Sequence, residues 1–165
     1  MKLLVEKNGS AKIPKVYFVG SDKNAKQYIA GKINEFALSA QVKILGFVSQ
    51  GQLVGLYKKA SALVYPTLFG PENLPALEAF ALECPVLASD VPGSEEQYRD
   101  AAILFKRFDA ADLAEKIMLL MNDAALRENL IAKGKKLAEE YSVQNYQQKM
   151  QEIFSDFSLY LRCWK

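Results

Sequence analysis

Five short apolar runs recur along this chain, and their spacing is the feature that most restricts its fold. The runs are rich in branched and aromatic residues, and the segments between them are long enough for helices. Such alternation is typical of repeated βα units, whose right-handed crossovers build a parallel sheet with helices on both faces. We therefore expect an α/β fold with a doubly wound parallel sheet of about five strands, at Val16–Val19, Val42–Leu45, Ala62–Tyr65, Pro85–Ala88 and Ala102–Phe105.

Composition excludes several classes of function. The 165 residues, 50% hydrophobic and 24% charged, fit one globular domain, and a net charge of +2 with interspersed signs argues against a nucleic-acid partner. The chain has no histidine, which excludes a histidine base, a Ser-His-Asp triad or a His-ligated metal in this chain. Cys84 and Cys163 form neither a CxxC pair nor a disulfide framework, so we expect no metal site and a reducing, cytoplasmic setting.

The stretch from Tyr65 to Phe80 predicts an anion-binding junction. It reads as the end of a buried strand, a loop rich in Pro and Gly, and a helix that Pro75 opens at its first position. A helix start leaves backbone N–H groups without partners, and its dipole favours negative charge there. We expect Glu78 in the first turn, at the edge of a core-facing stripe formed by Leu77, Phe80, Ala81 and Cys84. An ionised carboxylate with two acceptor oxygens suits vicinal hydroxyls, such as those of a ribose.

Three further segments have local signatures. Ser49 and Gln52 form a capping box that opens a helix. Glu95 and Glu96 follow a Pro-Gly turn, where acids more often stabilise a helix start than catalyse. The tail has a helically spaced apolar stripe, for which we expect packing on its own domain, with a partner domain or a membrane surface as alternatives: Ile153, Phe154, Phe157, Tyr160, Leu161 and Trp164.

Two consecutive motifs carry a resemblance to a known family. The segments at 73–81 and 84–94, Asn-Leu-Pro-Ala-Leu-Glu-Ala-Phe-Ala and Cys-Pro-Val-Leu-Ala-Ser-Asp-Val-Pro-Gly-Ser, resemble the donor-binding half of retaining glycosyltransferases of the GT-B fold, family 4 (glycosyl transferases group 1). The similarity extends from Val16 to Phe105 and thus covers most of the chain. It implies a Rossmann-like nucleotide-sugar donor-binding domain at 1–150, followed by an amphipathic tail helix at 151–165.

The resemblance also implies roles for particular residues. The family has two glutamates eight positions apart: the second, which holds the donor ribose, matches Glu78, and the first falls on Gly70. We therefore expect Glu72 to substitute as the catalytic carboxylate, in a donor loop that begins at Gly70. Asn73 and Leu74 match the amides that receive the sugar and diphosphate, and Phe47 and Val48 match backbone contacts to the nucleobase. The family uses neither a metal ion nor another cofactor.

Two expected parts have no match in this sequence. The family's donor domain begins with a strand and a basic pair, whereas this sequence matches from the following helix onward, and no acceptor-binding domain is recognisable. Since the unmatched strand would be central in a 3-2-1-4-5-6 sheet, its neighbours must close on each other, another chain must supply the strand, or exposed edges remain. We expect the isolated chain to be inactive without an N-terminal acceptor-binding domain or chain.

The leading function is binding of a nucleotide diphosphate sugar, a UDP-sugar in our reading, for retaining transfer to a polysaccharide or glycolipid of the lipopolysaccharide or capsule type. We expect a cytoplasmic protein, and contact of the tail with the inner face of the membrane stays open. One alternative is a noncatalytic nucleotide-sugar-binding or assembly module of a split enzyme. A nucleotide-sugar epimerase fragment and a flavodoxin-like signalling domain, with Asp90 as its acidic residue, complete the alternatives.

Overall fold

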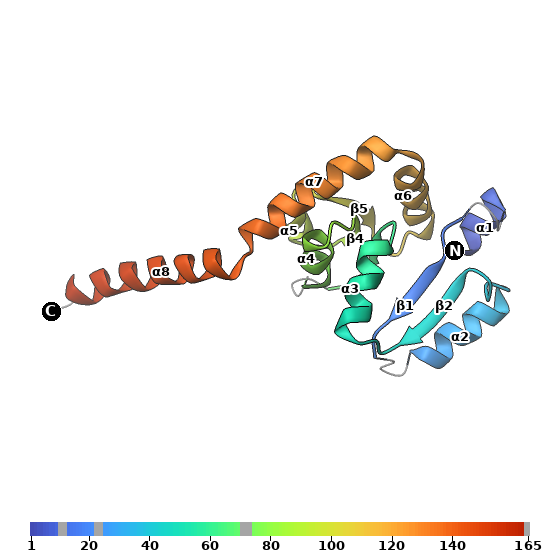
Figure 1. Cartoon of the computed structure of the whole chain (residues 1–165), viewed down its shortest axis with the longest axis horizontal. Helices are drawn as coiled ribbons and strands as arrows, with labels where there is room; N and C mark the ends of the chain where they lie inside the picture. Colours follow the sequence, from blue (N-terminus) through green and yellow to red (C-terminus); the bar gives the residue numbers. More distant parts are fainter. Residues whose placement is uncertain (10–12, 22–24, 70–73, 164–165) are drawn as a thin grey trace.

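The computed structural model describes residues 1–9, 13–21, 25–69 and 74–163, with side chains described as far as Ser158. Helices alternate with strands along most of the chain, and a long helix ends it (Figure 1). The elements are α1 (Lys2–Asn8), β1 (Val16–Val19), α2 (Lys26–Glu35), β2 (Val42–Gly46), α3 (Gln50–Lys59), β3 (Leu63–Tyr65), α4 (Leu74–Ala81), β4 (Val86–Asp90), α5 (Ser94–Tyr98), β5 (Ala102–Lys106), α6 (Ala110–Asn122), α7 (Ala124–Glu140) and α8 (Val143–Cys163).

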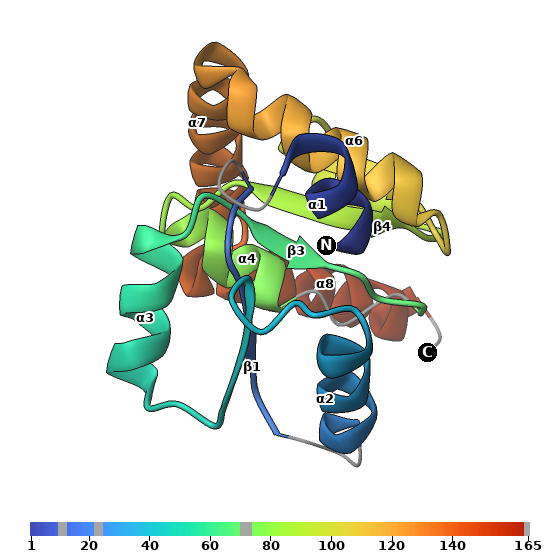
Figure 2. The ribbon, with the colours of Figure 1, turned by 90° about the vertical axis from the view of Figure 1, so that its right-hand side faces the viewer.

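The described strands form two parallel sheets, one of β1 and β2 and the other in the order β3-β4-β5. All pairings are parallel, with Val16 opposite Val42 in the first sheet and Leu63 opposite Val86 in the second. The expected α/β class and its five strands are confirmed. Within the described residues β1 and β3 do not pair, and in the view of Figure 2 the two strands run in different directions. Of the three outcomes expected for the sheet, neither a closed sheet nor a supplied strand is observed among the described residues, and β1 and β3 are both edge strands.

Strand β4 is the centre of the core because it is buried on both faces. Val86 and Ala88 point into one apolar cluster, which also contains Phe80 of α4 and Leu137 of α7 and which we call the cluster beside β4. Leu87 belongs to a second cluster, in which β5, α6 and α7 contribute Phe105, Leu120 and Leu130. Alternate residues of a strand face opposite sides of the sheet, so helices cover both faces of β3-β4-β5.

Helices α4 and α7 approach each other closely at Gly134. An added Cβ at this glycine would lie 2.6 Å from Cδ1 of the Phe80 ring, which is itself 1% exposed. Burial against both α7 and the sheet rotates the buried face of α4 to Ala76, Ala79 and Phe80. The predicted stripe is therefore wrong at Ala81, which is exposed.

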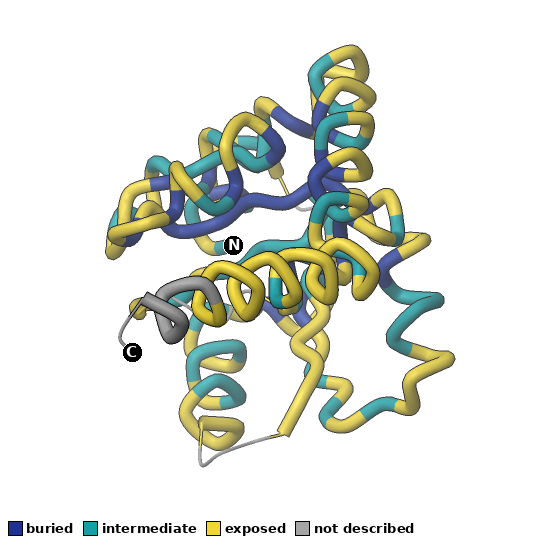
Figure 3. The backbone as a smooth tube through the Cα atoms, turned by 90° about the vertical axis from the view of Figure 1, so that its left-hand side faces the viewer, coloured by how far each residue is buried: buried dark blue, intermediate teal, exposed yellow. Residues whose placement is uncertain are grey.

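The chain is much less buried at its two ends than around β4. Tyr17, Phe18 and Val19 of β1 are each at least 40% exposed. Helix α8 extends away from the rest of the molecule (Figure 1). Its described side chains are exposed apart from the half-buried Met150 (Figure 3). The expected packing of the tail on its own domain is wrong for Ile153, Phe154 and Phe157, which are exposed. The side chains of Tyr160, Leu161 and Trp164 lie outside the description, and the helix begins at Val143 rather than near 151. Among the described residues, no helix has the length and apolar character needed to cross a bilayer.

Candidate functional site

The loop between β3 and α4 contains three of the predicted site residues. Gly70, Glu72 and Asn73 lie outside the described residues, so the roles expected for them stay predictions. Leu74 is the first residue of α4 and its side chain is 65% exposed. Its position at the start of an eight-residue helix agrees with the expected backbone contact to an anion, because the first N–H groups of a helix have no partner within it.

Glu78 lies one turn into α4, not in the first turn as predicted. The helix begins at Leu74, so Pro75 is its second residue and Glu78 its fifth. The side chain is exposed, and the hydroxyl of Tyr57 donates to its Oε2 over 3.2 Å. The same hydroxyl lies 3.4 Å from the carbonyl oxygen of Pro75. Tyr57 thereby connects the C-terminal part of α3 with the first turns of α4.

Tyr57 was not among the predicted site residues. Its ring is buried in the cluster beside β4, and this burial, followed by the charge of Glu78, raises the pKa of its hydroxyl well above the usual range. The sequence contains a helically spaced tyrosine in an apolar segment, which is a common core pattern. No local signal predicts its bond to a residue 21 positions later.

The loop between β2 and α3 holds the two residues expected at the nucleobase. Phe47 is 88% exposed and Val48 is half-buried, directly after the carboxyl end of β2. The predicted capping box follows them: Gln52 N donates to the side chain of Ser49, and Ser49 N donates to the side chain of Gln52. The cap fixes the start of α3, the helix that carries Tyr57. Ligands of open α/β sheets bind at the carboxyl ends of the strands, and Phe47 and Val48 lie at such an end.

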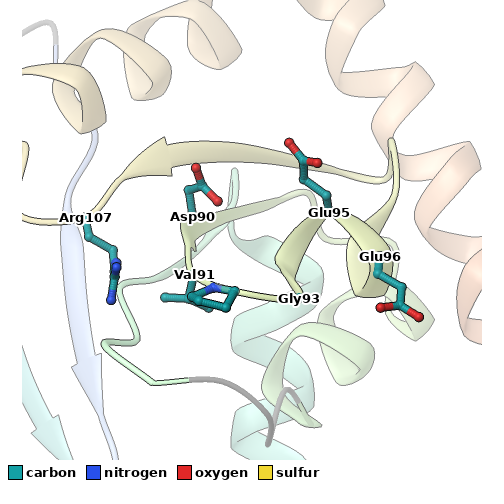
Figure 4. A pocket seen from close by; sticks show the side chains of 7 residues that line it. Asp90, Val91, Gly93, Glu95, Glu96 and Arg107 are labelled. Carbon is teal, nitrogen blue, oxygen red and sulfur yellow. The ribbon is translucent and has the colours of Figure 1, made fainter.

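A cavity of about 530 Å³ opens beside the carboxyl ends of β4 and β5 (Figure 4). The charged groups of its lining are the carboxylates of Asp90, Glu95 and Glu96 and the guanidinium of Arg107. Three carboxylates against one cation make this cavity better suited to hydroxyl donors than to a diphosphate. The sequence indicated Glu95 and Glu96 as acids of a first helical turn, which the structure confirms.

The turn that shapes this cavity is built by Gly93 and Ser94. Gly93 precedes α5 with φ of +89°, a left-handed conformation that glycine adopts without steric cost. The buried hydroxyl of Ser94 accepts from Val91 N and donates to Ser89 O, both over 3.1 Å. These bonds hold the loop after β4 in a fixed shape. The turn therefore has a structural explanation without any ligand.

Metal ligation has no candidate among the described residues. In that part of the chain, no three acidic, cysteine or histidine side chains, including the carboxylates of the cavity beside β4 and β5, are arranged so that they could hold a metal ion. Cys84 is buried in the cluster beside β4, and burial raises the pKa of its thiol to about 11. A protonated, buried thiol is neither a good nucleophile nor a metal ligand.

Comparison with known proteins agrees with this arrangement of strands and helices. O-antigen chain mannosyltransferase B of Escherichia coli is 31% identical over 104 residues, which cover 63% of this chain and 27% of that protein. Sucrose-phosphate synthase of Thermosynechococcus elongatus superposes with a TM-score of 0.78 at 25% identity, over 96% of this chain and 42% of that one. HepE of Anabaena, solved in complex with UDP-glucose, superposes with a TM-score of 0.76 at 19% identity, over 86% of this chain and 41% of that one.

The chain therefore spans about a quarter to two fifths of the length of these relatives. The family model of glycosyl transferases group 1 matches residues 1–137, most of the chain. With the α/β architecture and the similarity to these proteins, the match is decisive. The chain belongs to the glycosyl transferases group 1 family, whose structural relatives here have the GT-B fold.

Proposed function

We propose that this chain is the donor-binding part of a retaining glycosyltransferase and binds a nucleotide diphosphate sugar, most specifically a UDP-sugar. The observation that carries the proposal is Glu78, an exposed carboxylate one turn into α4 that a neutral hydroxyl holds. An ionised carboxylate accepts hydrogen bonds from the two hydroxyls of a ribose. The solved complexes of HepE with UDP and with UDP-glucose support a uridine nucleotide as the donor.

In this proposal the residues around α4 divide the donor between them. Glu78 binds the ribose, and the backbone at Asn73 and Leu74 stabilises the phosphates at the helix start. Phe47 and Val48 meet the nucleobase. Glu72 contacts the transferred sugar, in the loop that Gly70 begins. As the nucleoside diphosphate leaves, negative charge develops on its phosphate oxygens, and the backbone at the helix start stabilises that charge. In this proposal no metal ion or cofactor is bound to this chain.

In our proposal, the acceptor substrate binds to an acceptor-binding domain or chain and not to the residues of this chain. The named relatives include an O-antigen mannosyltransferase and a capsular polysaccharide glycosyltransferase of Staphylococcus aureus, which support a polysaccharide or glycolipid acceptor. Turnover then requires an N-terminal acceptor-binding domain or chain. A cytoplasmic location, with α8 resting on a partner or on the inner face of the membrane, stays part of the proposal.

A noncatalytic nucleotide-sugar-binding or assembly module is the second candidate. The observation that favours it is Gly70, which stands where the family has its first glutamate. Glu72→Gln in a complex with the acceptor-binding part separates the candidates: a sharp loss of turnover supports the enzyme with Glu72 as the substitute carboxylate, and unchanged turnover removes that role. Nucleotide binding without turnover in any such complex supports the module.

Calorimetric titration of the chain with UDP, without added metal, tests donor binding. We expect Glu78→Gln to weaken binding about tenfold or more, because a hydrogen bond to a charged group contributes roughly 1.5–3 kcal/mol. Glu83→Gln is the matched control, since Glu83 is equally a surface glutamate and forms an ion pair with Lys135. A folded wild-type chain that binds no UDP, or equal affinity in the Glu78 variant, contradicts the proposal.

A further inference from the structure

Tyr57 links the two helices that contribute to the proposed donor site. Its ring lies in the apolar cluster beside β4 and is 9% exposed, while its hydroxyl reaches out of the cluster to Glu78 and Pro75. The ring is therefore fixed by packing, and its hydroxyl has a defined position. A side chain held in this way can fix a neighbouring group that is itself exposed.

The hydroxyl of Tyr57 has one proton and two acceptors near it. Glu78 Oε2 lies at 3.2 Å and the carbonyl oxygen of Pro75 at 3.4 Å, both longer than the usual 2.7–2.8 Å for an O–H donor. Burial raises the pKa of the hydroxyl, so it stays protonated at neutral pH and acts as the donor. The carboxylate is thus held through Oε2 alone, by a hydrogen bond that is longer than usual and can shorten when a ligand binds.

Three other glutamates of the chain are held closely by cations. Glu83, Glu140 and Glu35 form ion pairs with Lys135, Arg99 and Lys32 over 2.7–2.8 Å. Among the described residues, Glu78 has no cation within ion-pair distance. A neutral donor on Oε2 leaves the negative charge of the carboxylate uncompensated. Such a carboxylate is a stronger acceptor for hydroxyl groups than one that is paired with lysine or arginine.

We propose that Tyr57 is a positioning residue for nucleotide binding: its hydroxyl holds Oε2 of Glu78 so that the carboxylate accepts the two ribose hydroxyls of the donor. This inference rests on the proposed function, and it assigns a role to a residue of α3 that does not itself contact the ribose. The restraint favours binding because fewer conformations of the Glu78 side chain are lost when the diol arrives.

The test compares UDP with 2′,3′-dideoxy-UDP in calorimetric titrations of the full chain. We expect Tyr57→Phe, which keeps the ring, to weaken UDP binding about five- to tenfold, less than the loss of a hydrogen bond to the ligand itself, because Tyr57 restrains Glu78 and does not contact the ribose. Binding of the dideoxy nucleotide should change less than twofold, because it has no ribose diol to bind. In the Glu78→Gln background, Tyr57→Phe should have little further effect on UDP.

Tyr98→Phe is the matched control. Tyr98 is another buried ring of the same cluster, and its hydroxyl has no hydrogen-bond partner among the described residues. Its removal should leave UDP affinity unchanged. If Tyr57→Phe weakens both nucleotides equally, or neither, the positioning role is overturned while donor binding stands. If the folded wild-type chain binds no UDP, the proposed function and this inference fail together.

Discussion

Gly134 lies where α4 and α7 pack together, and it has space for a hydrogen atom but not for a methyl group. A Cβ there would approach the buried ring of Phe80 to 2.6 Å. We expect Gly134→Ala to destabilise the fold by about 1–3 kcal/mol, since overpacking in a dense core exceeds the gain in helix propensity. Urea unfolding measures the change. Gly31→Ala in α2, where nothing lies within 4 Å, should stabilise by about 0.5–1 kcal/mol; equal effects at both sites would contradict the packing argument.

Because of Cys84, the free energy of unfolding should decrease at alkaline pH. Burial raises the pKa of the thiol from 9.0 to about 11, so the folded state disfavours the thiolate more than the unfolded state does. The contribution of the protonated thiol is fully present below pH 9 and is lost as pH rises towards 11. Between pH 8.5 and 10.5 the free energy of unfolding should fall by about 2 kcal/mol from this group alone.

The measurement for Cys84 is urea unfolding at several pH values, for the wild type and Cys84→Ala. The alanine variant should be less stable at pH 8.5 because of the lost volume, but its stability should fall less steeply with pH. Tyr98 contributes a remaining slope in both proteins, since burial raises the pKa of its hydroxyl to about 12. Parallel pH profiles of the two proteins would show that the thiol does not titrate as the structure implies.

Residue roles could be predicted from the sequence where they depend on neighbours in the chain. Ser49 and Gln52 are three residues apart, and their reciprocal bonds are confirmed. The bond from Tyr57 to Glu78 crosses between helices, so periodicity within either helix does not contain it. The buried stripe of α4 was misplaced at Ala81 for the same reason: contact with α7 decides which face is covered.

At the scale of elements, the edge strand β1 has a testable consequence. Edge strands expose unpaired N–H and C=O groups that can pair with another chain, and β1 also exposes Tyr17, Phe18 and Val19. We expect concentration-dependent association, reduced severalfold by Tyr17→Lys, because a charge on an edge strand opposes pairing. Sedimentation velocity over a concentration series measures it.

The control for the edge is Tyr28→Lys, which places the same charge on α2 at a side chain that is 70% exposed. Both variants are compared in a chain that ends at Tyr146, so that α8 does not contribute to association. Equal reduction by the two variants would assign the effect to net charge rather than to the strand edge.

The elements themselves were largely predictable, whereas their assembly was only partly so. Each strand gives a local apolar run, and β1 coincides with the predicted Val16–Val19. The separation between β1 and β3 depends on pairing partners distant in sequence, which a local pattern does not specify. Gly70, Glu72 and Asn73 remain predictions, because the structure does not describe their loop.

At the scale of the whole molecule, the contrast is between the core around β4 and a final helix that leaves it. The sequence indicated a helical apolar stripe in the tail but not what the stripe contacts, since amphipathicity reports a preference for burial and no partner. In the structure Ile153, Phe154 and Phe157 are each at least 60% exposed. They belong to α8, the helix that Figure 1 shows extending from the core. An unpacked helix of this kind has little stability of its own in water.

Removal of residues 147–165 should therefore leave the stability of the core unchanged within about 0.5 kcal/mol, as expected where no burial or cap is lost. Ending the chain at Ser142 should instead cost about 1 kcal/mol, because it also removes Asn145. The side-chain amide of Asn145 donates to the carbonyl oxygens of Glu139 and Glu140, over 3.0 and 3.3 Å, and so satisfies the last turn of α7. That turn follows Leu137, which packs in the cluster beside β4, so fraying there reaches the core. Thermal and urea unfolding of the two truncated chains, beside Asn145→Ala in the full chain, measure the difference. A large loss on removing 147–165 alone would mean that α8 packs against the core in solution, contrary to its exposed position in the structure.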